Sequence, residues 1–126
     1  MQTNSKTAST VASTIKHHAR DLASLPNRFA MCDARALAFA DVATALELCG
    51  IYLADFITTN DKTAARKYLP LATKVSEALS LLAGADESPV VGCCILSASS
   101  ALVKAHSAFQ AHVNDLLSAH SATVTA

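Results

Sequence analysis

The chain has 126 residues, enough for one domain with a single hydrophobic core but not for two. Its 10 basic and 10 acidic residues cancel, which argues against electrostatic binding to nucleic acid or to an anionic membrane. The composition is 52% apolar and rich in Ala, with only 3 Gly and 3 Pro. It excludes a sheet with many tight turns and predicts an all-α fold.

The first predicted helix runs from residue 4 or 5 to Leu25. Its core-directed stripe has spacings of three and four residues and consists of Val11, Ile15, His18, Leu22 and Leu25. We expect Pro26 to end this helix, because the residue before a proline is pushed out of the α region.

The second predicted helix, about residues 29–58, has the most regular pattern in the chain. Its seam repeats every three or four residues through Phe39, Val42, Leu46, Cys49, Leu53 and Phe56. The polar run 59–61 is predicted to stop this helix and to provide the N-cap of the next, because Asn and Asp side chains accept bonds from free first-turn amides.

The third predicted helix follows with a face made of Ala65, Tyr68, Ala72, Val75, Leu79 and Leu82. Pro70 falls inside this pattern, where it should either kink the helix or mark a restart after a short first turn. Gly84 is expected to end the helix.

The fourth predicted helix starts at Ser88 and Pro89, because Ser is a favoured N-cap and Pro a favoured first helical residue. It could extend to about Ser121 along an apolar stripe of Val91, Ile95, Leu102, Phe109, Val113 and Leu116. We expect residues 1–4 and 122–126 to be loose.

The net charges of the four segments are +3 (1–28), −3 (29–60), +2 (61–85) and −2 (86–126). Short connections make neighbouring helices antiparallel, and the alternating signs place opposite charges side by side. Residues 1–126 are therefore predicted to form one domain, an antiparallel up-down-up-down four-helix bundle. Helices 2 and 4 are predicted to be longer than 1 and 3, and their overhanging seams would favour a homodimer.

The location of the protein is predicted from its cysteines and from two absent signals. Residues 1–12 lack the apolar stretch of a secretion signal. The longest uncharged run, 88–103, is shorter than the roughly 20 residues that span a bilayer, so a core helix is expected there and no membrane partner. Four Cys without a secretion signal favour a reducing cytoplasm, and a mature secreted or periplasmic form is the alternative.

Four residues could form a metal layer near one end of the bundle. Counted from the connections, Cys32, Cys93, Cys94 and His18 fall within one or two turns of the same level. Thiolates and imidazoles are ligands of zinc and of cuprous copper, which would be the cofactor. The sequence favours a different interpretation, in which these cysteines pack as small apolar side chains, since no pair of ligands has a same-face spacing such as CxxxC.

The other histidines give weaker signals. His106 and Cys49 are expected at one level, without a third ligand. His112 and His120, near the C-terminal end, are expected to be solvated. His17, beside Arg20, is interpreted as a surface residue.

Residues 67–75, KYLPLATKV, loosely resemble an early helix 3 segment of the cysteine-rich four-helix copper-storage bundles. Cys49 and Cys93 stand where such proteins could hold thiols. That family lines its core with many cysteines at CxxxC spacing, whereas this chain has Ala and Ser there. Storage of many copper ions is therefore not expected of it.

No phosphate loop, nucleophile elbow, di-iron ExxH pair or haem motif occurs in the sequence. We therefore predict a non-enzymatic protein-interaction or scaffold module without a cofactor, whose partner is another protein or a second copy. The alternative is a module that binds a small ligand or a metal ion.

Overall fold

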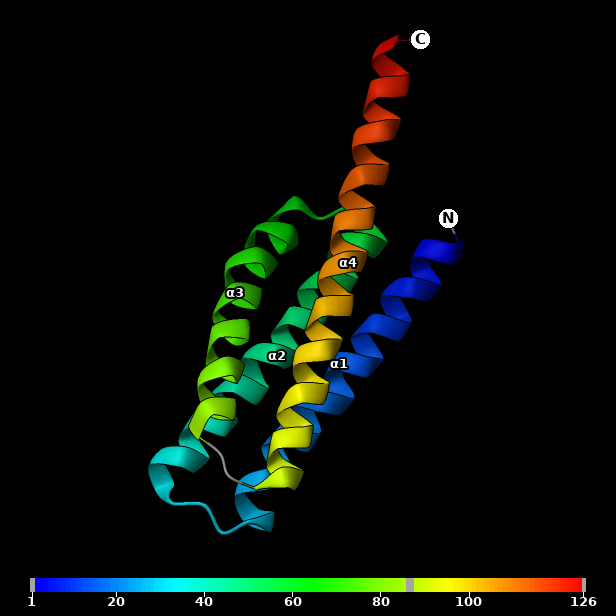
Figure 1. Cartoon of the computed structure of the whole chain (residues 1–126). Coiled ribbons are helices and arrows are strands. Elements are labelled where there is room, and N and C mark those ends of the chain that lie inside the picture. The colour runs from blue at the N-terminus through cyan, green and yellow to red at the C-terminus, as the bar shows by residue number, and fades with distance from the viewer. Residues whose placement is uncertain (1, 86–87, 126) are drawn as a thin grey trace.

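The computed structural model describes the backbone of residues 2–85 and 88–125 and the side chains of residues 8–84 and 88–120. Within these residues the chain forms four helices and no strand: α1 (Gln2–Arg28), α2 (Asp33–Thr59), α3 (Lys62–Ala85) and α4 (Pro89–Thr125). Successive helices run in opposite directions along the bundle (Figure 1). The predicted all-α four-helix fold is confirmed.

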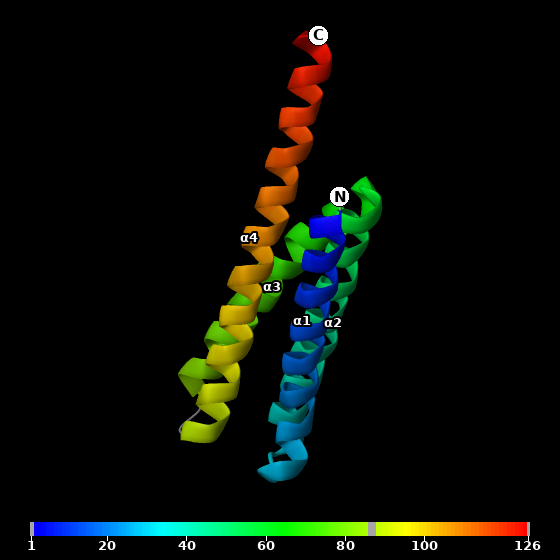
Figure 2. The ribbon, with the colours of Figure 1, turned by 90° about the vertical axis from the view of Figure 1, so that its right-hand side faces the viewer.

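The helices are arranged so that neighbours in the chain are also neighbours in space. α1 packs against α2 and α4, and α3 packs against α2 and α4. Within the part of the chain that the structure describes, α1 and α3 make no contact. The most extensive contact joins α1 to α2, and the thinnest contact between neighbours joins α3 to α4. Figure 2 shows α1 and α2 lying almost along each other, with α3 inclined to both. Each neighbouring pair therefore combines segments of opposite net charge, as predicted.

The core consists of the predicted seams. Every seam residue of α2 is buried, as are Tyr68, Val75 and Leu79 of α3 and Val91, Ile95 and Phe109 of α4. The α1–α2 contact is close because it uses small residues: a Cβ atom built on Gly50 would lie 3.0 Å from Cγ2 of Ile15. A Cβ atom at this position would require the Ile15 side chain to shift by a few tenths of an ångström.

The end of α1 differs from the prediction, because Pro26 does not stop the helix at Leu25. The helix continues to Arg28, and Leu22 and Leu25 are fully buried. Proline removes only one backbone bond, and this apolar packing holds the chain helical through it. The stop comes at Ala30, which has φ 48°, and the Met31 N–H donates to the Pro26 carbonyl at 3.1 Å. This is the pattern of a Schellman cap, with Ala where Gly is usual.

The junction between α2 and α3 follows the prediction. Asn60 caps α2 in the left-handed conformation, with its N–H donating to the Phe56 carbonyl at 2.8 Å. Oδ1 of Asp61 accepts from the amides of Thr63 at 2.9 Å and Ala64 at 3.3 Å, so Asp61 is the N-cap of α3. Pro70 lies inside a continuous α3, so the predicted restart is wrong.

α4 begins at Pro89 and has 37 residues, so it is longer than α1 and α3, as predicted. The length prediction fails for α2, because α1 and α2 have 27 residues each. Residues 2–4 and 122–125 are helical, although both termini were expected to be loose. Met1 and Ala126 lie outside the described residues. The C-terminal end of α4 extends past all three other helices (Figures 1 and 2).

Candidate functional site

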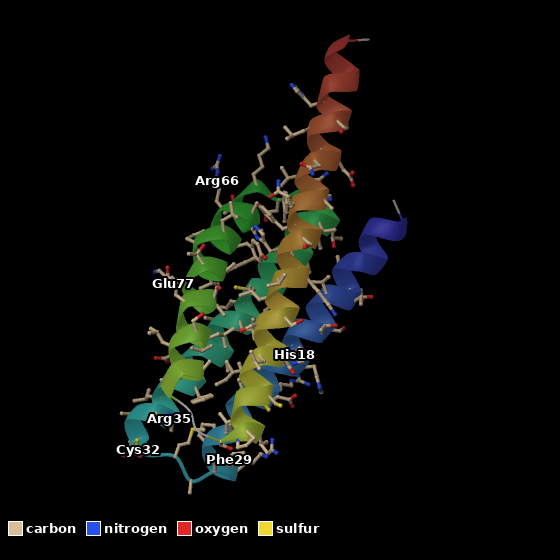
Figure 3. The ribbon with its side chains drawn as sticks, viewed as in Figure 1. His18, Phe29, Cys32, Arg35, Arg66 and Glu77 are labelled. Carbon is tan, nitrogen blue, oxygen red and sulfur yellow. The ribbon has the colours of Figure 1, made fainter. Side chains whose placement is uncertain are left out.

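The four residues predicted to form a metal layer do not converge. Cys32 and Cys93 are exposed, Cys94 is half-buried and His18 is half-buried. Figure 3 shows Cys32 at the α1–α2 connection and His18 farther along the bundle on α1. Among the residues that the structure describes, no group of three or more His, Cys, Asp or Glu side chains is placed to hold a metal ion.

The physical reason is that residues at a similar height along a bundle can point in different directions around their helices. Cys32 is the N-cap residue of α2 and lies outside its first turn. Cys93 and Cys94 are consecutive on α4, so their side chains leave the helix about 100° apart. Cys94 packs against the core while Cys93 is exposed. Zinc or copper binding by this set stays a prediction, for which elemental analysis of protein purified without chelator is the direct measurement.

The structure instead gathers aromatic side chains where α4 leaves the bundle. This end cluster consists of Phe56 of α2, Tyr68 of α3, and Phe109 and His112 of α4. Phe109 lies 5.1 Å from Phe56 and 5.0 Å from Tyr68, between ring centroids. His112 meets Phe56 edge-on at 4.9 Å. All four side chains are buried, so the cluster joins three helices at one level.

A hydrogen bond ties the end cluster to the α2–α3 connection. Nε2 of His112 lies 2.6 Å from Oδ1 of Asn60. Because an amide oxygen only accepts, Nε2 carries the proton and donates. Nδ1 of His112 is buried without a hydrogen-bond partner. The bond fixes α4 to the cap of α2 at the point where α4 begins to project.

Two weakly acidic groups are buried in this region, the thiol of Cys49 and the hydroxyl of Tyr68, which belongs to the end cluster. Burial raises the pKa of the Cys49 thiol from 9.0 to about 12. Burial, and then the proximity of Cys49, raise the pKa of the Tyr68 hydroxyl well above its usual value. The Tyr68 hydroxyl has no hydrogen-bond partner. Both groups therefore stay neutral at ordinary pH, and neither is a ready nucleophile or base.

His112 is the member of this site that sequence analysis placed wrongly, since it is buried and not solvated. The signal was present in the spacing, because Ala105, Phe109, His112 and Leu116 recur at intervals of three and four. By contrast, the expected shared level of Cys49 and His106 agrees with the structure. Cys49 on α2 is close enough to Tyr68 to raise the pKa of its hydroxyl. The ring of His106, on α4, lies 6.5 Å from the ring of Tyr68.

An apolar stripe also runs along the outside of α4. Leu96, Val103 and Leu117 are 67%, 67% and 60% exposed, and with Gln110 they repeat every seven residues. We call these four residues the outer stripe. At about 100° per residue they lie roughly 120° around the helix from its buried seam. This second repeat was not recognised in the sequence.

A groove of about 500 Å³ lies between α3 and α4, where these two helices make their thinnest contact. Its walls carry apolar side chains at Leu69, Ala72, Leu102 and Val103, together with Thr73, Ser76, Glu77, Ser80, Ser99, His106 and Ser107. Val103 belongs to both the groove and the outer stripe, so the two features are continuous. A smaller groove of about 380 Å³ lies between α1 and α2.

Two helical segments, Asp33–Thr59 and Pro89–His120, are long and apolar enough to cross a membrane, judged by length and composition only. In the bundle both contribute buried residues to the common core. A core helix of this kind passes the same test, so the finding does not decide between the two environments.

Comparisons with protein-family models, with curated proteins and with solved structures gave no match to this chain. The site must therefore be interpreted from its own residues.

Proposed function

We propose that this chain is a non-enzymatic protein-interaction module in which the bundle holds α4 as the binding element. The observation that carries the proposal is the outer stripe of α4. It presents three large apolar side chains at a regular interval, each at least 60% exposed. Burying each of them in an interface would contribute about 1–2 kcal/mol, because complete burial of Leu or Val gives roughly 1.5–3 kcal/mol.

The end cluster supports the proposal because it holds α4 in place. Phe109 and His112 are fixed by contacts with α2 and α3, and the Asn60 bond adds a polar tie at the same level. A helix held in this way loses little conformational freedom when a partner binds. The buried, neutral Cys49 and Tyr68 have a structural role in this proposal. We propose a cytoplasmic location for the module, because four free thiols suit a reducing compartment.

Photo-crosslinking in cells that express the protein tests this function. A benzophenone amino acid at Leu117 should give a discrete protein adduct, whether with a second copy or with another protein. The same probe at Leu81 is the matched control, because Leu81 is 76% exposed on α3 and outside the groove. Val103→Lys should abolish the Leu117 adduct. Equal, diffuse labelling from both positions would refute an interaction role for α4.

A second candidate is the binding of a small apolar ligand, and the groove between α3 and α4 favours it. The groove has the size of a small-molecule site. An apolar fluorescent dye should bind there in a saturable way and be lost in Leu102→Ser. If dye binding is unchanged in that variant, the groove is not its site.

A further inference from the structure

From the shape of α4 and the repeat along it, we infer that the partner of the outer stripe is a second copy of this chain. The inference rests on the proposed interaction role of α4 and names its occupant. In this dimer the two α4 helices pair antiparallel, with the twofold axis at Gln110. The projecting end of each α4 lies along the α3–α4 groove of the other copy.

The first support is the self-complementary register of the outer stripe. In an antiparallel pair centred on Gln110, Val103 of each copy lies opposite Leu117 of the other, and the two Gln110 amides face each other. Leu96 and Leu117 are 21 residues apart, which is three heptads. One polar residue in an apolar seam is a common device for fixing register, because a shifted pairing would bury its amide against apolar groups.

The second support is the room that this orientation leaves for the bundles. His112 marks the level at which the other helices end, because it touches Asn60 at the α2–α3 connection. Residues 113–125 therefore continue for about 20 Å beyond that level. Antiparallel pairing at Gln110 places the two bundles at opposite ends of the joined α4 helices. A parallel pairing would set the bundles at the same level, side by side.

The third support is the match between the projecting end and the groove. Val113 and Leu117 continue the face that carries Val103 and His106, which line the groove. In the proposed register His120 of one copy falls at the level of Ser99 and Ser100 of the other. Glu77 of α3, which is labelled in Figure 3, also lines the groove. The groove therefore offers an acidic side chain to the imidazole of His120.

Analytical ultracentrifugation of the full chain from about 1 to 200 μM tests the dimer, since this range brackets a micromolar Kd. We expect a reversible monomer–dimer equilibrium. Leu117→Lys and Val103→Lys should each weaken it by at least about tenfold, because twofold symmetry makes each substitution disturb two layers. Leu81→Lys, on the exposed side of α3, should leave it unchanged. All variants should retain the helicity of the parent, as measured by circular dichroism.

Disulfide trapping tests the direction of pairing. In a background with Cys32, Cys93 and Cys94 replaced by Ser, Gln110→Cys should form a covalent dimer on mild oxidation, because the two positions meet at the axis. Leu117→Cys should not, since its two copies lie far apart. A strictly monomeric parent, a dimer insensitive to Leu117→Lys, or efficient trapping at Leu117 would overturn the inference. A Leu117 adduct with a different protein, from a monomeric parent, would overturn it while leaving the proposed function standing.

Discussion

The buried hydroxyl of Tyr68 gives the sharpest test of the energetics of this core. The side chain is fully buried, and its oxygen has no hydrogen-bond partner. In the unfolded chain this hydroxyl is hydrated, so folding strips it of water without compensation. Tyr68→Phe removes the oxygen and keeps the ring that stacks on Phe109 at 5.0 Å.

The expected size of the effect follows from the cost of an unsatisfied polar group. Leaving a buried hydroxyl unpaired costs about 1–3 kcal/mol. Phenylalanine fills almost the same volume, so little packing is lost and no large cavity forms. We therefore expect Tyr68→Phe to raise the free energy of unfolding by about 1–2 kcal/mol, with a rise in Tm of several degrees for a domain of this size.

Urea unfolding, followed by circular dichroism at 222 nm, measures this change. The slope m should be the same for Tyr68→Phe and for the parent protein. Tyr52→Phe is the matched control, because Tyr52 is half-buried on α2 and should respond by less than about 0.5 kcal/mol. A loss of 1 kcal/mol or more in Tyr68→Phe would refute the reasoning. It would mean that the hydroxyl is bonded in solution, for instance to an internal water molecule.

Three further predictions concern stability. Ala30→Gly should stabilise the protein by about 1 kcal/mol in thermal melts, because Ala30 has φ 48° and Gly adopts this region without strain; no change would argue against the α1 cap. Asn60→Gly should destabilise by about 1–2 kcal/mol in urea titrations, because it keeps the left-handed cap but leaves Nε2 of His112 unpaired. In a His112→Phe background the cost should fall below about 0.5 kcal/mol, and an equal cost in both backgrounds would count against the bond. The third prediction is alkaline destabilisation. The pKa of Cys49 is raised to about 12 in the folded state, so above pH 9 the unfolded chain loses a proton that the folded chain keeps. Below pH 9 the contribution of Cys49 to the free energy of unfolding is fully present. As the pH rises from 9 towards 12, this contribution falls by about 1.4 kcal/mol per pH unit. Cys49→Ala should flatten this slope, and an unchanged slope would contradict the assignment.

Much of the fold could be predicted from local rules. The seam of α2 from Phe39 to Phe56 is buried as its spacing predicted. Asn60 and Asp61 end one helix and begin the next, because their short polar side chains satisfy exposed backbone groups. The alternating segment charges agree with the order in which the helices pack.

The candidate site was predicted less well. Its geometry depends on the direction in which each side chain leaves its helix, as well as on the height of the residue along the bundle. Cys32, Cys93, Cys94 and His18 were expected at one level, but among the described residues no three of them are placed to hold a metal ion. His112 was expected in solvent, whereas its ring meets Phe56 edge-on and reaches Asn60, 52 residues away in the chain. No periodicity within one helix identifies such a partner.

The sequence by itself determined which residues are helical and which face of each helix is buried, because helix propensity, caps and apolar spacing act over a few residues. The overhang of α4 also follows from its predicted length. Only the tertiary structure decided that α1 continues through Pro26. It also decided that the outer stripe of α4 stays uncovered within one copy. These features depend on how four helices of unequal length pack against one another, which is a property of the whole chain and not of any one segment.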